Sequence, residues 1–167
     1  MSESAIKEQI KLILSTSTGV NNTNLKPGRI HDYRRWANNW DDYLDLFKDQ
    51  DDKVNAWIIS RVSCAEKMLT MPSENLVAIE WNIYGIYGLN DSLASEIDFQ
   101  DLIDGIRAKF RINRNLNSTC DTIRPEWGPM AGLYGIQSPL IGYAKFGGVL
   151  CHYTELKLGT QHRENRV

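Results

Sequence analysis

The side chains able to do chemistry in this 167-residue chain stand far apart in the sequence. Cys151 and His152 are adjacent, but they lie in a segment that we predict to be a strand, where consecutive side chains point to opposite faces. A thiol and an imidazole placed in this way do not easily form a nucleophile–base pair. Catalysis there would need a partner such as Cys64 or His31, and no spacing in the sequence indicates one.

Three aspartates, Asp98, Asp101 and Asp104, lie on a predicted helix on the side opposite its apolar residues. Paired carboxylates act as general acid and base only in a pocket that shifts their pKa values. We expect these three to face water instead. The nucleophile motif Gly-x-Ser-x-Gly is also missing from the sequence. The residues therefore favour a protein that is not an enzyme.

Motifs for metals and cofactors are equally weak. Residues 49–53 begin like a calcium-binding loop, but Val54 occupies the position of the required glycine and Ser60 that of the bidentate glutamate. The three cysteines form no Cys-x-x-Cys pair, and three histidines offer few ligands for zinc. No glycine-rich phosphate-binding motif occurs. We expect no cofactor or metal, and cysteines that stay reduced and pack as small apolar residues.

Charge is divided unevenly along the chain, although the total is only −2. Residues 38–53 hold six aspartates against two lysines, a net charge of −4, while residues 105–116 hold four basic residues and no acid, a net charge of +4. Two such segments can meet in a repeated head-to-tail contact, which forms a ring when it closes. The alternative is that both are solvated surfaces. The candidate subunit-interface residues are Asp41, Asp45, Asp49, Arg107, Arg111 and Arg114.

Hydrophobic periodicity and turn residues predict the elements that hold these side chains. The predicted helices cover residues 3–14, 35–48 and 92–111, the last with Asp91 or Ser92 as its N-cap. The predicted strands cover residues 55–63, 77–87, 132–143 and 148–160. Residues 112–131, with several asparagines, two prolines and a glycine, predict a long loop.

This order of elements predicts an α+β domain with an antiparallel sheet of about four strands and helices packed mainly on one face. Residues 1–160 would form this single domain, and residues 161–167 a polar C-terminal tail. A composition with 42% hydrophobic and 24% charged residues excludes disorder and a disulfide scaffold. No apolar run approaches the roughly 20 residues that span a bilayer, so we expect no membrane contact.

Several local stretches are similar to one family. Residues 81–100, followed by 106–110, resemble a strand, a polar turn and a Ser-Glu-capped helix of small phage neck and tail proteins, and residues 146–158 resemble their closing strand. Residues 31–36 and 57–61 fit the same layout. Over residues 28–160 the chain thus resembles the tail terminator or tail completion (neck) proteins of long-tailed bacteriophages and prophages.

The resemblance implies a homo-oligomeric ring, commonly a hexamer, at the end of the tail tube. Such a ring stops tube growth and forms the head–tail joining surface, so the implied partners are copies of the chain itself, the tail tube protein and the head connector or stopper proteins. It implies a virion protein assembled in the cytoplasm of the host bacterium, which meets nucleic acid at most indirectly, through the ring lumen. The long loop 112–131 is expected to order on assembly or to line that lumen. No catalytic residue is carried over, and neck stopper proteins fit the same description.

Two other functions stay open on the sequence alone. One is a small ligand- or nucleic-acid-binding α+β module without catalytic activity, in which the basic residues around Phe110 would contact phosphates; the acidic overall charge argues against it. The other is an enzyme whose site is assembled from scattered residues. That would require a pocket converging on His152 and two carboxylates.

Overall fold

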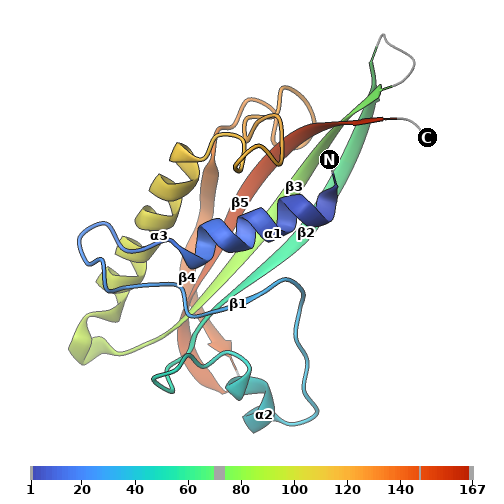
Figure 1. The fold of residues 1–167 in the computed structure, drawn as a ribbon. Coiled ribbons are helices and arrows are strands. Elements are labelled where there is room, and N and C mark those ends of the chain that lie inside the picture. Colours follow the sequence, from blue (N-terminus) through green and yellow to red (C-terminus); the bar gives the residue numbers. More distant parts are fainter. Residues whose placement is uncertain (1, 70–73, 147, 166–167) are drawn as a thin grey trace.

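The computed structural model describes residues 2–69, 74–146 and 148–165. Its centre is a five-stranded sheet in the order β1-β2-β3-β5-β4 (Figure 1). The strands are β1 (Arg29–His31), β2 (Asn55–Met68), β3 (Glu74–Gly88), β4 (Ile136–Phe146) and β5 (Val149–Asn165). Neighbouring strands are antiparallel, except that β1 runs parallel to β2. The predicted α+β class with a mainly antiparallel sheet is confirmed.

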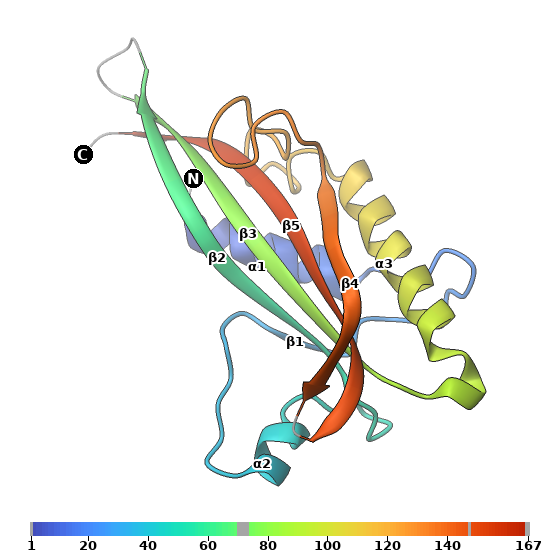
Figure 2. The same ribbon diagram turned by 180° about the vertical axis from the view of Figure 1, so that it is seen from behind.

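Two helices, α1 (Glu3–Ser15) and α3 (Ser95–Ile112), cover one face of the sheet, as Figures 1 and 2 show from opposite sides. The first helix begins where Ser2 Oγ accepts a hydrogen bond from the Ala5 amide at 3.3 Å, which satisfies a free donor of the first turn. The predicted apolar sides of both helices are buried against the sheet. They consist of Ile6, Ile10, Ile13 and Leu14 in α1, and Phe99, Leu102, Ile103, Ile106 and Phe110 in α3.

Side chains from the sheet form the other half of this core, because alternate residues of a strand point to the same face. The odd-numbered residues of β3 from Val77 to Ile83 point towards the helices and pair with the even-numbered residues of β5. Trp81 is fully buried among them, and its indole Nε1 donates a hydrogen bond of 2.9 Å to Thr160 Oγ1. The polar end of this large core side chain is therefore satisfied without water.

A smaller apolar cluster lies on the opposite face, where the short helix α2 (Trp40–Asp45) packs near one end of the sheet. Phe47 contacts the rings of Tyr43 and Phe146, with ring centroids 5.1 and 4.5 Å apart. The predicted helix over 35–48 is wrong in extent. Asn39 Oδ1 accepts a hydrogen bond from the Asp42 amide at 2.8 Å, and this cap starts the helix at Trp40.

The start of α3 also differs from the prediction. Asp91–Leu93 forms a short 3-10 turn, and the helix begins at Ser95, after Ala94 in the left-handed region with φ of 50°. Neither Asp91 nor Ser92 is the N-cap. The Ser95 hydroxyl instead accepts a hydrogen bond of 2.8 Å from the Asn90 amide, which ties the helix to the preceding turn.

The loop predicted over 112–131 is irregular in the structure, but it belongs to the core. Leu116, Cys120 and Ile123 are at most 2% exposed and pack in the main cluster. The Ile123 amide also donates to the Arg114 carbonyl at 2.9 Å. The expectation that this loop orders only on assembly is therefore wrong, because the single chain already packs its apolar side chains.

The same loop corrects the predicted tail. Strand β5 continues to Asn165, so residues 161–165 are not a frayed end. The Gln161 carbonyl accepts hydrogen bonds from the amides of Asp121 and Thr122, at 2.8 and 3.3 Å, and the Gln161 side chain accepts one of 2.9 Å from the Glu126 amide. Polar residues of the strand are buried here because partners far away in the sequence satisfy them.

Candidate functional site

The acidic half of the predicted interface is only partly available. Asp41 and Asp45 are exposed on α2, and Asp45 lies 3.1 Å from the Lys48 ammonium. Asp49 is half-buried, and its carboxylate accepts hydrogen bonds from the amides of Asp51 and Lys53 at 2.9 and 3.1 Å. Asp49 therefore stabilises its own turn, as short acidic side chains commonly do. This leaves Asp41 and Asp45 as the candidates that face outward.

The basic half lies at the C-terminal end of α3. Arg111 and Arg114 are exposed, whereas Arg107 is half-buried and lies 3.3 Å from Asp104. The backbone near them is held in place, since the Arg111 carbonyl accepts a hydrogen bond of 2.6 Å from the Tyr134 hydroxyl. Positive side chains there also complement the negative end of the helix dipole. Arg111 and Arg114 are thus free to meet a partner without disturbing the fold.

The two groups are not brought together within the chain. α2 lies at one end of the molecule, and the C-terminal end of α3 lies towards the other, in both Figure 1 and Figure 2. A contact between opposite charges beyond about 10 Å is largely screened in physiological salt. Attraction between these groups therefore requires a second molecule.

Exposed apolar side chains lie along the edge of the sheet near α3. Strand β4 has no neighbouring strand on its outer side within the described part of the chain. Three of its exposed residues are large and apolar, and α3 adds two more. These residues are Leu140, Ile141 and Tyr143 in β4, and Ile97 and Ile112 in α3. Sequence periodicity identified the buried side of α3 correctly but gave no sign of this outer surface.

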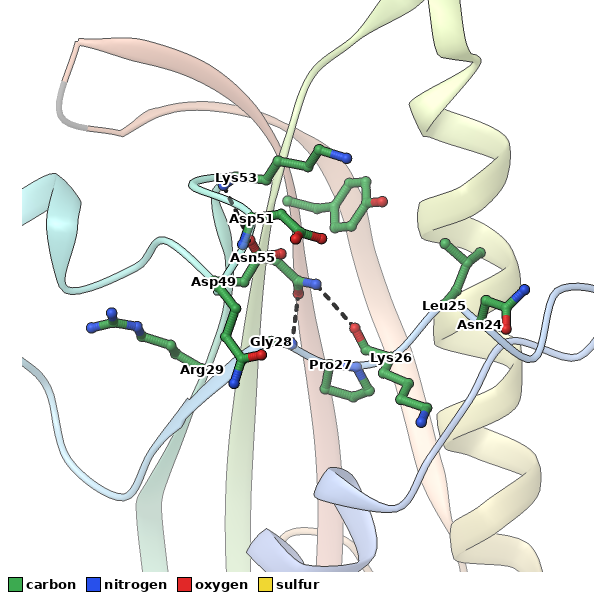
Figure 3. Close-up of a pocket in the computed structure, with 12 residues that line it drawn as sticks. Asn24, Leu25, Lys26, Pro27, Gly28, Arg29, Asp49, Asp51, Lys53 and Asn55 are labelled. Atoms are coloured by element: carbon green, nitrogen blue, oxygen red, sulfur yellow. Dashed lines mark hydrogen bonds between the residues drawn. The ribbon is translucent and has the colours of Figure 1, made fainter.

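The largest cleft near the α2 end has a volume of about 750 Å³ and opens between residues 24–29 and the turn 49–53 (Figure 3). Asn55 closes its floor: its Nδ2 donates to the Lys26 carbonyl, and its Oδ1 accepts from the Gly28 amide, both at 3.0 Å. The charged side chains that line the cleft are of both signs, because Lys26, Arg29 and Lys53 occur there together with Asp49 and Asp51. The cleft therefore has no uniform potential for an anion or a cation.

A buried Ser–His contact was missed by the sequence analysis. Ser95 Oγ lies 2.8 Å from His152 Nε2, and the two residues are only 5% and 3% exposed. The imidazole packs between Phe99 and Tyr143, with ring centroids 5.7 and 5.2 Å away, and burial lowers its pKa, so it is neutral near pH 7. The hydrogen bond joins the start of α3 to β5. The two residues are 57 positions apart, and no local signal reveals the pair.

Asp101 does not face water as predicted. Its carboxylate accepts hydrogen bonds from the amides of Asn21 and Asn22, at 2.8 and 3.0 Å, and from the Asn21 side chain at 2.7 Å. These bonds lower the pKa of Asp101, because they favour its charged form. Asp101 thus anchors the loop that follows α1, while Asp104 is largely exposed.

The cysteines are free thiols in the structure: Cys120 and Cys151 are buried in the two apolar clusters, but Cys64 is exposed. Among the described residues, no group of three potential metal ligands lies close enough together to hold an ion. No helix in the same residues is long and apolar enough to cross a membrane. No known protein-family model matches the chain, and no curated protein matches it.

Proposed function

We propose that this protein is a structural virion protein of a long-tailed bacteriophage or prophage, and that copies of it assemble as a ring at the end of the tail tube. As a tail terminator or tail completion protein it would stop tube growth and form the head–tail joining surface. Its partners would be its own copies, the tail tube protein and the head connector or stopper, and it would perform no catalysis.

One observation carries the proposal. The exposed acidic residues of α2 and the exposed basic residues at the end of α3 lie at opposite ends of one small fold, so neither can neutralise the other within the chain. Surfaces of opposite charge on opposite ends suit a head-to-tail contact, in which each copy uses both surfaces. The family resemblance of residues 28–160 implies the same kind of assembly.

Measuring the molar mass by size-exclusion chromatography with light scattering, over a series of protein and salt concentrations, tests the assembly. We expect a discrete oligomer that dissociates as salt rises, because salt screens exposed charge pairs. Arg111→Glu with Arg114→Glu should weaken the oligomer, and so should Asp41→Lys with Asp45→Lys. Mixing the two variants should recover part of it, since the unchanged flanks re-form the native contact and the two reversed flanks are again opposite in charge.

Lys7→Glu with Lys11→Glu, the same number of charge reversals on α1, is the control and should leave the mass unchanged. A strict monomer at every protein concentration would contradict the proposal. So would an oligomer that is indifferent to charge reversal on both flanks.

The tail-end role needs a separate measurement. Purified tail tube protein should polymerise into tubes of limited length when this protein is added, and electron microscopy should show an extra ring at one tube end. Unlimited growth and bare tube ends would contradict a terminator role, even for a protein that forms rings by itself.

The cleft in Figure 3 favours one alternative, a small ligand- or nucleic-acid-binding module. Fluorescence anisotropy with labelled oligonucleotides separates the two functions. A binding module should lose affinity steeply as salt rises, because phosphate contacts release counterions. We expect no sequence-independent binding of this kind, since acidic residues interrupt the basic rim of the cleft.

A further inference from the structure

The sheet has two open edges, and they lie at different positions along the strand direction. β4 is the last strand on one side. On the other side β1 pairs only with residues 56–58 of β2, so within the described residues the far part of β2 has no neighbouring strand on its outer side. Unpaired strand edges carry free amide and carbonyl groups and readily pair with another chain.

Natural proteins usually block such edges, and here both edges are blocked only in part. A register shift occurs in β4 between Gln137 and Leu140, and another in β2 between Arg61 and Ser63. Beyond these irregularities, residues 140–146 and residues 63–68 pair regularly with their inner neighbours. The two regular stretches are similar in length and are the parts of each edge that can accept a new strand.

We propose that residues 143–146 of one copy pair with residues 65–68 of a second copy, so that the sheet continues from subunit to subunit. This inference rests on the proposed ring function and names its joint. The strand order supports it: β2 and β5 run in one direction and β3 and β4 in the other. A second copy in the same orientation therefore presents β2 antiparallel to β4, which is the more stable pairing.

The side chains on the helix-covered face are complementary. In β4 this face carries Tyr143 and Lys145, because Tyr143 pairs with His152 under α3. In β2 it carries Glu66 and Met68, because Glu66 pairs with the buried Val77. When Met68 stands opposite Tyr143 in an antiparallel pair, Glu66 stands opposite Lys145. An exposed apolar pair and an exposed pair of opposite charges then form in one register.

The joint requires a displacement along the strands, since residues 140–146 lie level with the part of β2 nearer to β1. Closing a sheet on itself requires tilted and staggered strands, and the stagger here is large: through the strand pairs Tyr143 lies level with Asn55, whereas the joint sets it opposite Met68. The repeated contact is heterologous and gives a closed ring when the rotation per copy allows it. A two-fold contact of β4 with β4 is the competing arrangement.

Disulfide cross-linking of the full chain tests the joint. The exposed native thiol is first removed by Cys64→Ser, and Glu66→Cys is then combined with Lys145→Cys. Under mild oxidation we expect a ladder of disulfide-linked multimers on a non-reducing gel, ending at the size of the ring. Neither single variant should cross-link alone, but the two single variants mixed together should give a linked dimer.

Register is checked by moving the second cysteine along β4. Ile141→Cys lies on the helix-covered face but four residues from Lys145, and the matched control Ala144→Cys lies next to Lys145 on the opposite face. Cross-linking of Glu66→Cys to Lys145→Cys, and to neither of these two positions, supports the joint, because only facing thiols whose Cα atoms lie within about 7 Å can be bridged. Cross-linking to Ile141→Cys instead of Lys145→Cys would overturn this register.

The outcomes separate this inference from the proposed function. A dimer that Lys145→Cys forms alone would replace the joint with a two-fold contact and overturn the inference. An oligomer seen by light scattering that no pair cross-links would also overturn the inference, while the proposed assembly survives. A monomer by light scattering, with no cross-links, would overturn both.

Discussion

Gly105, in the middle of α3, gives the most decisive test of how closely the loop after α1 packs against this helix. A Cβ atom added at Gly105 would lie 1.7 Å from the Thr18 carbonyl oxygen and 3.2 Å from Gly19 Cα. Both are backbone atoms, so no side-chain rotation relieves the overlap. Glycine is therefore required there for the close approach of helix and loop, although it weakens the helix itself.

The expected magnitude follows from two opposing effects. In an open helix Gly105→Ala would stabilise by about 1 kcal/mol through helix propensity. Overpacking against a fixed neighbour costs typically 1–3 kcal/mol, and a backbone overlap of this size belongs at the upper end, about 3 kcal/mol. We therefore expect a net loss of about 2 kcal/mol in the free energy of unfolding.

Urea denaturation followed by circular dichroism measures this loss. With a slope of about 2 kcal/mol per molar urea, the midpoint should fall by about 1 M. Gly142→Ala is the matched control, because a Cβ there meets nothing within 4 Å, and it should change stability by less than about 0.5 kcal/mol. A Gly105→Ala variant as stable as the wild type would refute the close packing of Thr18 on α3.

Three further predictions concern buried polar groups. Trp81→Phe should lower the free energy of unfolding by about 1–3 kcal/mol, because Thr160 Oγ1 loses its buried donor, and a double-mutant cycle with Thr160→Val should show coupling in thermal melts. Burial lowers the pKa of His152, so the unfolded state binds the proton more readily than the folded state. Stability should therefore be full above the unfolded pKa of about 6.5 and decline as pH falls below it. His152→Gln should reduce this pH dependence in urea titrations. The pKa of Asp101 is also lowered in the fold, so its contribution to stability should persist above the unfolded pKa of about 3.9 and vanish as pH falls through the folded pKa. Asp101→Asn should remove this acid dependence in thermal melts recorded as pH is lowered.

The parts of the fold that sequence patterns predicted are those with long, regular burial. The alternation in β3 and the apolar sides of α1 and α3 each repeat over several turns or residue pairs, so local spacing was sufficient. By contrast, β1 has only three residues, which is too short for any period to be visible. The aromatic residues of 35–48 have helical spacing, but part of that segment packs as a loop, where Trp36 contacts Tyr43 at 5.8 Å between ring centroids.

The candidate sites were harder to predict because they depend on contacts between distant segments. The bond between Ser95 and His152 and the anchoring of Asn21 by Asp101 each join residues more than 50 positions apart. Polarity was also misleading in residues 161–165, where backbone pairing with residues 74–78 of β3 turns a hydrophilic stretch into a strand. Charge counting found the segments carrying Asp41 and Arg111, but it could not show that Asp49 is occupied by its own turn.

The place of β5 in the sheet has a consequence for synthesis on the ribosome. This strand is the last along the described chain, yet it lies between β3 and β4 and pairs with both. Until it emerges, a nascent chain has β3 with one bare edge and β4 with no inner neighbour, and the hydrophobic sides of α1 and α3 have an incomplete surface to cover. Such late closure through non-local pairing slows folding and prolongs exposure to aggregation. Premature termination before β5 should therefore leave a species that chaperones and proteases recognise, rather than a shorter native domain.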